Sequence, residues 1–197
     1  MRLSNGEHES HPWRISEVAP DFRLEDVWAL PVQGGAGDFA SLLEVMASLD
    51  PAHGESRATR ALFAIRYRVG EWLGWDEGPR TLAIPQAIET TLSARLPEDL
   101  RNTAATGADP SSYGFVPLYR TDVEWAAEIS NRTVHAVMHL AWVEQGNGVY
   151  RGQMAVYVKT RGRLGAVYMA VIAPFRHRVV YPALMRQIER AWKARVA

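Results

Sequence analysis

The 197-residue sequence contains no cysteine, which excludes disulfide bonds, thiolate metal ligands and cysteine nucleophiles. It also lacks the P-loop, GxSxG, HExxH and paired-CxxC patterns that accompany common nucleotide, hydrolase and metal sites. Serine, histidine and aspartate are present, but no spacing among them singles out a catalytic triad. We therefore expect no cofactor, and the absence of cysteine fits a cytoplasmic protein.

Long apolar runs are missing as well. The longest nearly uncharged stretch near the C-terminus is Leu164–Phe175, which lies between Arg163 and Arg176. A membrane-spanning helix needs about 20 apolar residues, so we expect no stable membrane insertion. The first ten residues are polar and lack the apolar core of a signal peptide. We expect residues 1–10 to be a disordered tail and residues 11–197 to form one domain.

Neither sign of charge dominates, because 22 Lys and Arg residues balance 22 Asp and Glu residues. The distribution is uneven: residues 1–60 carry five basic against ten acidic side chains, and residues 159–197 carry nine against one. A basic C-terminal helix is compatible with nucleic acid or anionic lipid, but no nucleic-acid-binding motif accompanies it. We favour a solvated helix face that pairs with acidic residues of the same fold, and expect no nucleic-acid partner.

What the sequence does contain is a strict alternation of apolar and polar residues. Between Thr133 and Glu144, one parity carries Val134, Ala136, Met138, Leu140 and Trp142. Successive side chains of a β-strand point to opposite faces, so this pattern predicts a strand with one apolar face.

The flanking segments alternate in the same way and predict two hairpins. With a turn at Asn131-Arg132, the first hairpin pairs Glu124 with His139 and Glu128 with His135. With a connection over Gln145–Val149, the second pairs Met154 with Leu140 and Val156 with Met138. Both hairpins give the same apolar face, which predicts an antiparallel meander.

Shorter patterns predict the remaining elements. We expect a strand over Leu24–Val32, a helix that Asp38 caps and that ends near Leu49, a helix over Ser56–Leu73, and a strand over Thr81–Ile84. After Gly162 the apolar spacing predicts helix to about Arg195. Pro174 and Pro182 must kink or divide this helix, because proline lacks a donor and crowds the preceding turn.

Three segments resemble an uncharacterised bacterial family, a domain of unknown function that is sometimes fused behind an NAD(P)-binding domain: FVPLYRTDVEWAAEISNRTVHAVMHLAWV (115–143), YRGQMAVYVK (150–159) and PFRHRVVYPALMRQIERAW (174–192). The predicted element order is similar to that of the START-like, or SRPBCC, helix-grip superfamily. This resemblance implies an α+β helix-grip fold that holds an apolar ligand between the sheet and the long helix. The sequence has no Gly-rich dinucleotide motif, and the family offers no catalytic residues to carry over.

One candidate site lies between the meander and the last helix. Its ligand-binding candidates are Trp125, Met138, Leu140, Trp142, Met154, Val156, Tyr168, Ile172, Phe175 and Arg176. Such residues can line a cavity for a lipid, an isoprenoid or an aromatic metabolite, and the Pro174 kink can aim Tyr168 or Arg176 at the polar end of the ligand. The alternative is a fully packed core, which such residues form in most proteins.

A second candidate site uses the other face of the meander. Glu124, Glu128, His135 and His139 share that face and can bind a divalent metal or act as an acid/base pair. The alternative, which we favour, is a solvated face with ordinary ion pairs and no metal. The same face carries apolar residues, which invites a homodimer contact.

Three functions stay open at this point. The leading hypothesis is binding of a small apolar or amphipathic molecule between sheet and C-terminal helix. The second is an enzyme of the cyclase, dehydratase or hydrolase type in the same cavity, with His139, Glu124 or Tyr168 in acid/base roles. The third is a homodimeric interaction module with a filled core.

Overall fold

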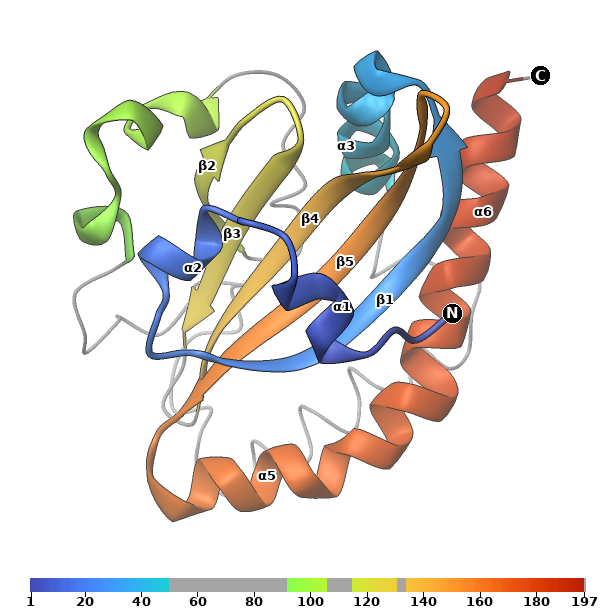
Figure 1. Ribbon diagram of the computed structural model, residues 1–197. Coiled ribbons are helices and arrows are strands. Elements are labelled where there is room, and N and C mark those ends of the chain that lie inside the picture. Colours follow the sequence, from blue (N-terminus) through green and yellow to red (C-terminus); the bar gives the residue numbers. More distant parts are fainter. Residues whose placement is uncertain (50–91, 106–114, 131–133, 197) are drawn as a thin grey trace.

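A computed structural model describes residues 1–49, 92–105, 115–130 and 134–196 (Figure 1). The helix expected over Ser56–Leu73, the strand expected over Thr81–Ile84 and the turn expected at Asn131-Arg132 lie outside the described residues. None of the helices in the described ranges is long and apolar enough to cross a membrane.

The centre of the molecule is a curved antiparallel sheet with the strand order β1-β5-β4-β3-β2 (Figure 1). Its strands are β1 (Arg23–Gly34), β2 (Val116–Arg120), β3 (Glu124–Ser130), β4 (Val134–Gly146) and β5 (Val149–Thr160). The strand expected over Leu24–Val32 lies inside β1, and β3, β4 and β5 form the predicted meander. The α+β class and the antiparallel meander are therefore confirmed.

The two hairpins differ in how well their register was predicted. In β4–β5, Met138 lies opposite Val156 and Leu140 opposite Met154, as expected. In β3–β4, Glu124 lies opposite Ala141 and Glu128 opposite Val137, so the predicted pairing is wrong by two residues. A shift of two residues keeps every side chain on its own face, so alternation alone cannot detect it.

The C-terminal helices and α3 cover one face of the sheet, here called the helix face. Helix α3 (Phe39–Ser48) follows the short turn η1 (Ala36–Asp38) and confirms the helix expected there. Asp38 stands at its N-cap position, but the Asp38 side chain accepts from the Gly35 N–H and makes no hydrogen bond to the helix. The long C-terminal helix is also confirmed, in three parts: α5 (Gly162–Phe175), the π-helical turn η6 (Arg176–Val180) and α6 (Tyr181–Val196). Pro174 and Pro182 flank the π-turn, because proline interrupts the regular backbone hydrogen bonds of an α-helix.

Large apolar side chains fill the part of the helix face under α3 and α6. The buried cluster contains Trp28, Leu30, Val32, Phe39, Leu42, Leu43, Val45, Met46, Leu49, Trp125, Ala127, Met138, Leu140, Trp142, Met154, Tyr181, Ile188 and Trp192. At Gly152 a Cβ atom would lie 2.8 Å from Val32 Cγ2, so β5 needs glycine where β1 and α3 approach it.

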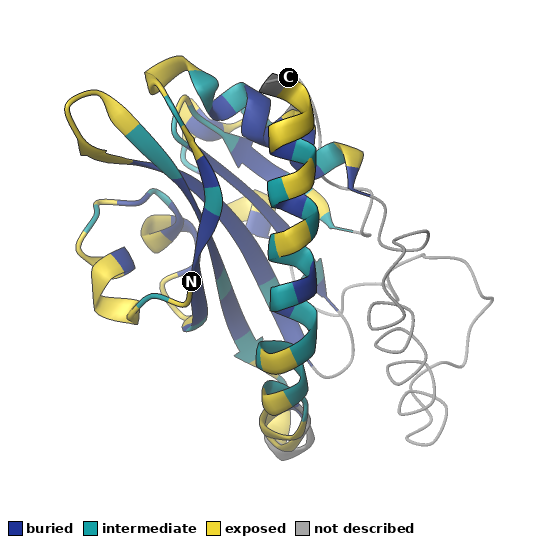
Figure 2. Cartoon of the chain, turned by 90° about the vertical axis from the view of Figure 1, so that its right-hand side faces the viewer, coloured by how far each residue is buried: buried dark blue, intermediate teal, exposed yellow. Residues whose placement is uncertain are grey.

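The opposite face, here called the histidine face, is buried as well, which overturns the prediction of a solvated face (Figure 2). Two groups of elements cover it: α1 (Asn5–Glu9) and α2 (Ile15–Val18), and the turns η2 (Leu92–Arg95), η3 (Glu98–Leu100) and η4 (Thr103–Ala105). They contribute Trp13, Ile15, Val18, Leu92, Leu96 and Leu100 to one buried cluster with the sheet. Hydrophobic burial of these residues explains why the face is covered.

The first residues are placed against the sheet, in contrast to the disordered tail that we expected. The Leu3 N–H donates to the Val27 carbonyl at 2.9 Å, and the Ala29 N–H donates to the Met1 carbonyl at 2.8 Å. Asn5 Nδ2 donates to the Leu24 carbonyl at 2.8 Å. The outer edge of β1 offers unpaired backbone donors and acceptors, and the N-terminal residues satisfy them.

Candidate functional site

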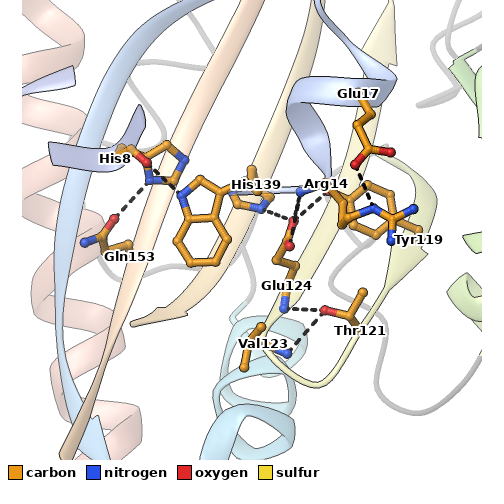
Figure 3. Close-up of polar contacts among 10 residues, drawn as sticks. His8, Arg14, Glu17, Tyr119, Thr121, Val123, Glu124, His139 and Gln153 are labelled. Carbon is orange, nitrogen blue, oxygen red and sulfur yellow. Dashed lines mark hydrogen bonds and ion pairs between the residues drawn. The ribbon is translucent and has the colours of Figure 1, made fainter. Parts of the chain in front are cut away.

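A network of buried polar groups occupies the histidine face, and Glu124 lies at its centre (Figure 3). Glu124 Oε2 accepts hydrogen bonds from His139 Nε2 at 3.1 Å and from the Tyr119 hydroxyl at 3.0 Å. The Arg14 backbone N–H also donates to the carboxylate, at 3.0 Å. Glu124 is 4% exposed and His139 is fully buried, so these hydrogen bonds compensate the desolvation of the charge.

Residue His8 reaches this network from α1 (Figure 3). His8 Nδ1 lies 3.0 Å from Gln153 Oε1, and Trp13 Nε1 donates to the His8 carbonyl at 2.9 Å. The rings of His8 and His139 have centroids 5.3 Å apart. The N-terminal segment thus inserts a buried imidazole into the polar centre of the face.

Burial and neighbouring charges lower the pKa values of His8 and Glu124 and raise the pKa of Tyr119. Burial, and then the nearby His139, lower the pKa of His8 to about 4. Burial raises the pKa of Glu124, but His139, Arg14 and Tyr119 outweigh burial, so this pKa lies below its ordinary value. Burial and the Glu124 carboxylate raise the pKa of Tyr119, so its hydroxyl stays protonated and donates.

A second histidine–carboxylate pair lies further along the same strands. His135 Nε2 lies 2.6 Å from Glu128 Oε2, and the Leu92 N–H donates to that oxygen at 3.2 Å. Among the described residues, no group of three or more His, Cys, Asp or Glu side chains is arranged to hold a metal ion. The predicted set of four therefore forms two separate pairs.

The histidine face also bears on the other functional predictions. The homodimer contact was expected because an exposed face carries apolar residues, and the protein's own N-terminal segment covers that face. His139 and Glu124 point away from the helix face, so they lie on the opposite side of the sheet from the predicted ligand-binding residues. His8 and Trp13 were not predicted, because no local pattern links them to the meander.

The predicted ligand-binding residues of the sheet share the helix face, but the burial of the predicted set differs from residue to residue. Trp125, Leu140, Trp142 and Met154 are at most 2% exposed among the side chains of α3 and α6. Val156, Ile172, Phe175 and Arg176 are only partly buried. Tyr168 lies in α5, and its side chain is outside the described residues. Near α5 the sheet is covered by a small cluster of Val134, Val158 and Met169, with Ala136, Val156 and Ile172 packed against it.

A buried carboxylate that the sequence analysis missed lies beside this region. Asp26 is fully buried, and its Oδ1 lies 2.6 Å from His177 Nε2. Asp26 Oδ2 lies 2.7 Å from Arg176 Nη2 and accepts from the Tyr181 hydroxyl at 3.2 Å. Arg2 Nη2 approaches Oδ1 to 3.4 Å. The π-turn η6 presents Arg176 and His177 together, and π-turns are frequent at functional sites.

The conformation of β1 places the Asp26 side chain on the helix face, where it contacts η6 and α6. A register irregularity between Leu24 and Asp26 places Leu24 in the histidine-face cluster, whereas Trp28 packs on the helix face. Asp26 lies opposite Val156, which lies opposite Met138, so the three form one row across β1, β5 and β4. A charged residue within the otherwise apolar pattern of this strand was the signal in the sequence.

An open hollow of about 410 Å³ lies at another place, between η1, the start of α3 and the connection of β2 to β3. It is lined by Ala36, Gly37, Phe39, Ala40, Arg120, Asp122, Val123 and Tyr150. None of the predicted site residues lines it. The buried polar groups of both faces lie elsewhere, so we do not place the candidate site there.

Together these features define an α+β domain with a five-stranded antiparallel sheet, a long C-terminal helix and a buried polar network on each face. Residues 18–183 match the protein family of unknown function DUF2867, and the chain belongs to this family. No curated protein and no solved structure matches the chain. The matched range contains Asp26, Val156 and Arg176 of the helix face, whereas His8 and Trp13 lie before it.

Proposed function

We propose that this protein binds a small amphipathic molecule between its sheet and the C-terminal helices, next to the π-turn η6. One observation carries the proposal: apolar side chains are incompletely covered where α5 meets the sheet. Val156 and Ile172 are partly buried, whereas Leu140 and Met154 on the same face are buried almost completely. Small-molecule sites are lined mostly by apolar side chains with a few polar groups among them.

The polar part of such a site is supplied by Asp26 and its partners. Asp26 lies in the same cross-strand row as Val156 and Met138. Arg176 Nη2 contacts Asp26, and Arg176 Nη1 lies 3.9 Å from the sulfur of Met169, which packs in the cluster near α5. Charged and apolar groups thus meet at one place, which favours a ligand with both kinds of surface.

The proposal agrees with the helix-grip arrangement, in which the long C-terminal helix closes on the sheet around a ligand. Membership of the START-like superfamily and a cytoplasmic location stay predictions. An enzyme in this site would need a reacting group on the helix face. The predicted His139 and Glu124 belong to the other face, and the third candidate, Tyr168, lies in α5 with its side chain outside the described residues.

Two measurements test the proposal. Native mass spectrometry of freshly purified protein is expected to show a co-purifying small molecule. N-phenyl-1-naphthylamine, a dye that fluoresces in apolar surroundings, is expected to bind, and Ile172→Arg is expected to abolish binding. Val171→Arg is the matched control, because Val171 is the neighbouring residue of α5 and is 71% exposed.

Circular dichroism checks that both variants fold. Val156→Thr serves as a milder second variant, because it keeps the shape of the side chain and adds a hydroxyl to the apolar surface. Absence of both dye binding and a co-purifying molecule would refute the proposal. Equal dye binding by the Ile172 and Val171 variants would also refute it.

A further inference from the structure

Two buried N–H donors near Asp26 have no acceptor among the described residues. They are Trp28 Nε1 and Arg176 Nε; Arg176 Nη2 also makes no hydrogen bond, but it lies 2.7 Å from Asp26 Oδ2 in an ion pair. Trp28 is 8% exposed, and the Arg176 side chain is 12% exposed. A buried donor without an acceptor costs about 1–3 kcal/mol, and folded proteins leave few of them. An acceptor from outside the chain is the natural partner for such donors.

The two donors lie in the same corner of the proposed site. Trp28 packs against Tyr181, with ring centroids 4.8 Å apart, and the Tyr181 hydroxyl donates to Asp26 Oδ2. Arg176 Nη2 lies 2.7 Å from the same carboxylate oxygen. Arg176 also contacts Met169, and Met169 packs against the apolar residues near α5. The polar end of an amphipathic ligand therefore meets donors here.

The charges around this corner restrict what the acceptor can be. Arg2, Arg176 and His177 contact Asp26, and Arg23 and Arg176 contact Glu25, with Arg176 Nη2 at 3.9 Å from Glu25 Oε1. A carboxylate ligand at these donors would lie beside the buried Asp26 carboxylate, which already pairs with Arg176, and burial strengthens the repulsion between the two like charges. An ammonium group brings only donors and leaves both N–H groups unsatisfied.

We propose that the polar end of the ligand is an uncharged carbonyl group, as in a ketone, aldehyde or ester, whose oxygen accepts hydrogen bonds from Trp28 Nε1 and Arg176 Nε. The inference rests on the proposed function and names the chemical class of its ligand. Asp26 then acts as a positioning residue that holds the Arg176 guanidinium and the Tyr181 hydroxyl in place.

The test is displacement of N-phenyl-1-naphthylamine by three ten-carbon compounds: 2-decanone, decanoate and decylamine. Their hydrocarbon parts are matched, so differences in affinity report on the head group. We expect 2-decanone to bind about tenfold more tightly than either charged compound, which is the scale of one or two net hydrogen bonds.

Variants identify the donors. Trp28→Phe keeps an aromatic ring against Tyr181 and removes the N–H, and Arg176→Lys keeps a positive charge near Asp26 and removes Nε. Each is expected to weaken 2-decanone binding about fivefold and to leave decylamine binding unchanged. Trp192→Phe is the control, because Trp192 has similar burial on the same side of the sheet.

The outcomes separate this inference from the proposed function. Equal affinities for the three compounds, a preference for decanoate, or equal losses in the Trp28 and Trp192 variants would overturn the inference while dye binding upholds the proposed function. Absence of dye binding in the unaltered protein would overturn both.

Discussion

The two faces of the sheet are both buried, but different chemistry buries them. On the helix face, Trp125, Leu140 and Trp142 pack against apolar residues of α3 and α6. On the histidine face, Glu124 and His139 are buried among aromatic and aliphatic residues under α1 and α2. Alternation in a strand therefore shows which residues share a face, and says nothing about whether a polar face meets water.

The difference has consequences for stability. Apolar burial is non-directional and scales with the area removed from water. A buried hydrogen-bond network depends on every partner, because a single unsatisfied group loses its solvation without compensation. Substitutions on each face test this difference.

The largest effect is expected on the helix face. Trp125→Ala should lower the free energy of unfolding by about 3–5 kcal/mol, because it leaves a cavity under the helices where the side chain is 1% exposed. Denaturant unfolding measures this change. Val116→Ala in β2, where the valine is 46% exposed, should change the free energy by less than about 0.5 kcal/mol. Similar losses in both variants would contradict the assigned core.

The histidine face should respond nearly as strongly to loss of one charge. Glu124→Leu should cost about 2–4 kcal/mol, because Tyr119, His139 and the Arg14 N–H lose their acceptor. The double variant Glu124→Leu/His139→Leu should be less destabilised than the sum of its single variants, since fewer buried polar groups stay unpaired. Strict additivity in urea unfolding would show that the network contributes no coupling.

We expect the free energy of unfolding to fall at acidic pH because of two groups on the histidine face, His8 and Glu124. The His8 pKa is about 4 in the folded protein and 6.5 when unperturbed, so the unfolded chain takes up the proton first. Stability is therefore lost as pH falls from about 6.5 to 4, by at most about 3 kcal/mol. Glu124, whose pKa is also lowered, adds a loss in the same direction below its ordinary pKa of 4.5.

Thermal unfolding across this pH range measures the effect, and His8→Phe serves as the comparison. The variant removes the titrating group and should show a flatter dependence on pH between 6.5 and 4. His11→Phe is the control, because His11 lies on the same segment and is less buried. A wild-type slope retained in the His8 variant would contradict the burial of a neutral imidazole.

The smallest effect is expected where the N-terminal segment meets Asp26. Arg2→Ala should change the free energy of unfolding by less than about 1 kcal/mol, because the Arg2 side chain is 51% exposed and Asp26 keeps Arg176, His177 and Tyr181 as partners. Arg176→Ala should cost more than Arg2→Ala in the same assay, since Arg176 is far less exposed. The reverse order would contradict the assigned role of the π-turn.

Much of the fold follows from local pattern. The period of two identified β3, β4 and β5, and helical spacing identified α3 and the C-terminal helix with its break near Pro174. The two-residue error in β3–β4 arose because such a shift preserves the face of every side chain. The pairs of His135 with Glu128 and His139 with Glu124 survived this error, because diagonal neighbours on one face are still within reach.

The amino-acid order by itself determined which side chains share a strand face and where helices must bend, because those properties depend on neighbours along the chain. Only the tertiary structure decided that α1, α2 and the segment around η2 and η3 close over the histidines, and that η6 brings Arg176 and His177 to Asp26. Such contacts join segments more than 100 residues apart, as in His177 with Asp26. Burial and charge pairing at that separation arise from packing of whole elements, which no local period encodes.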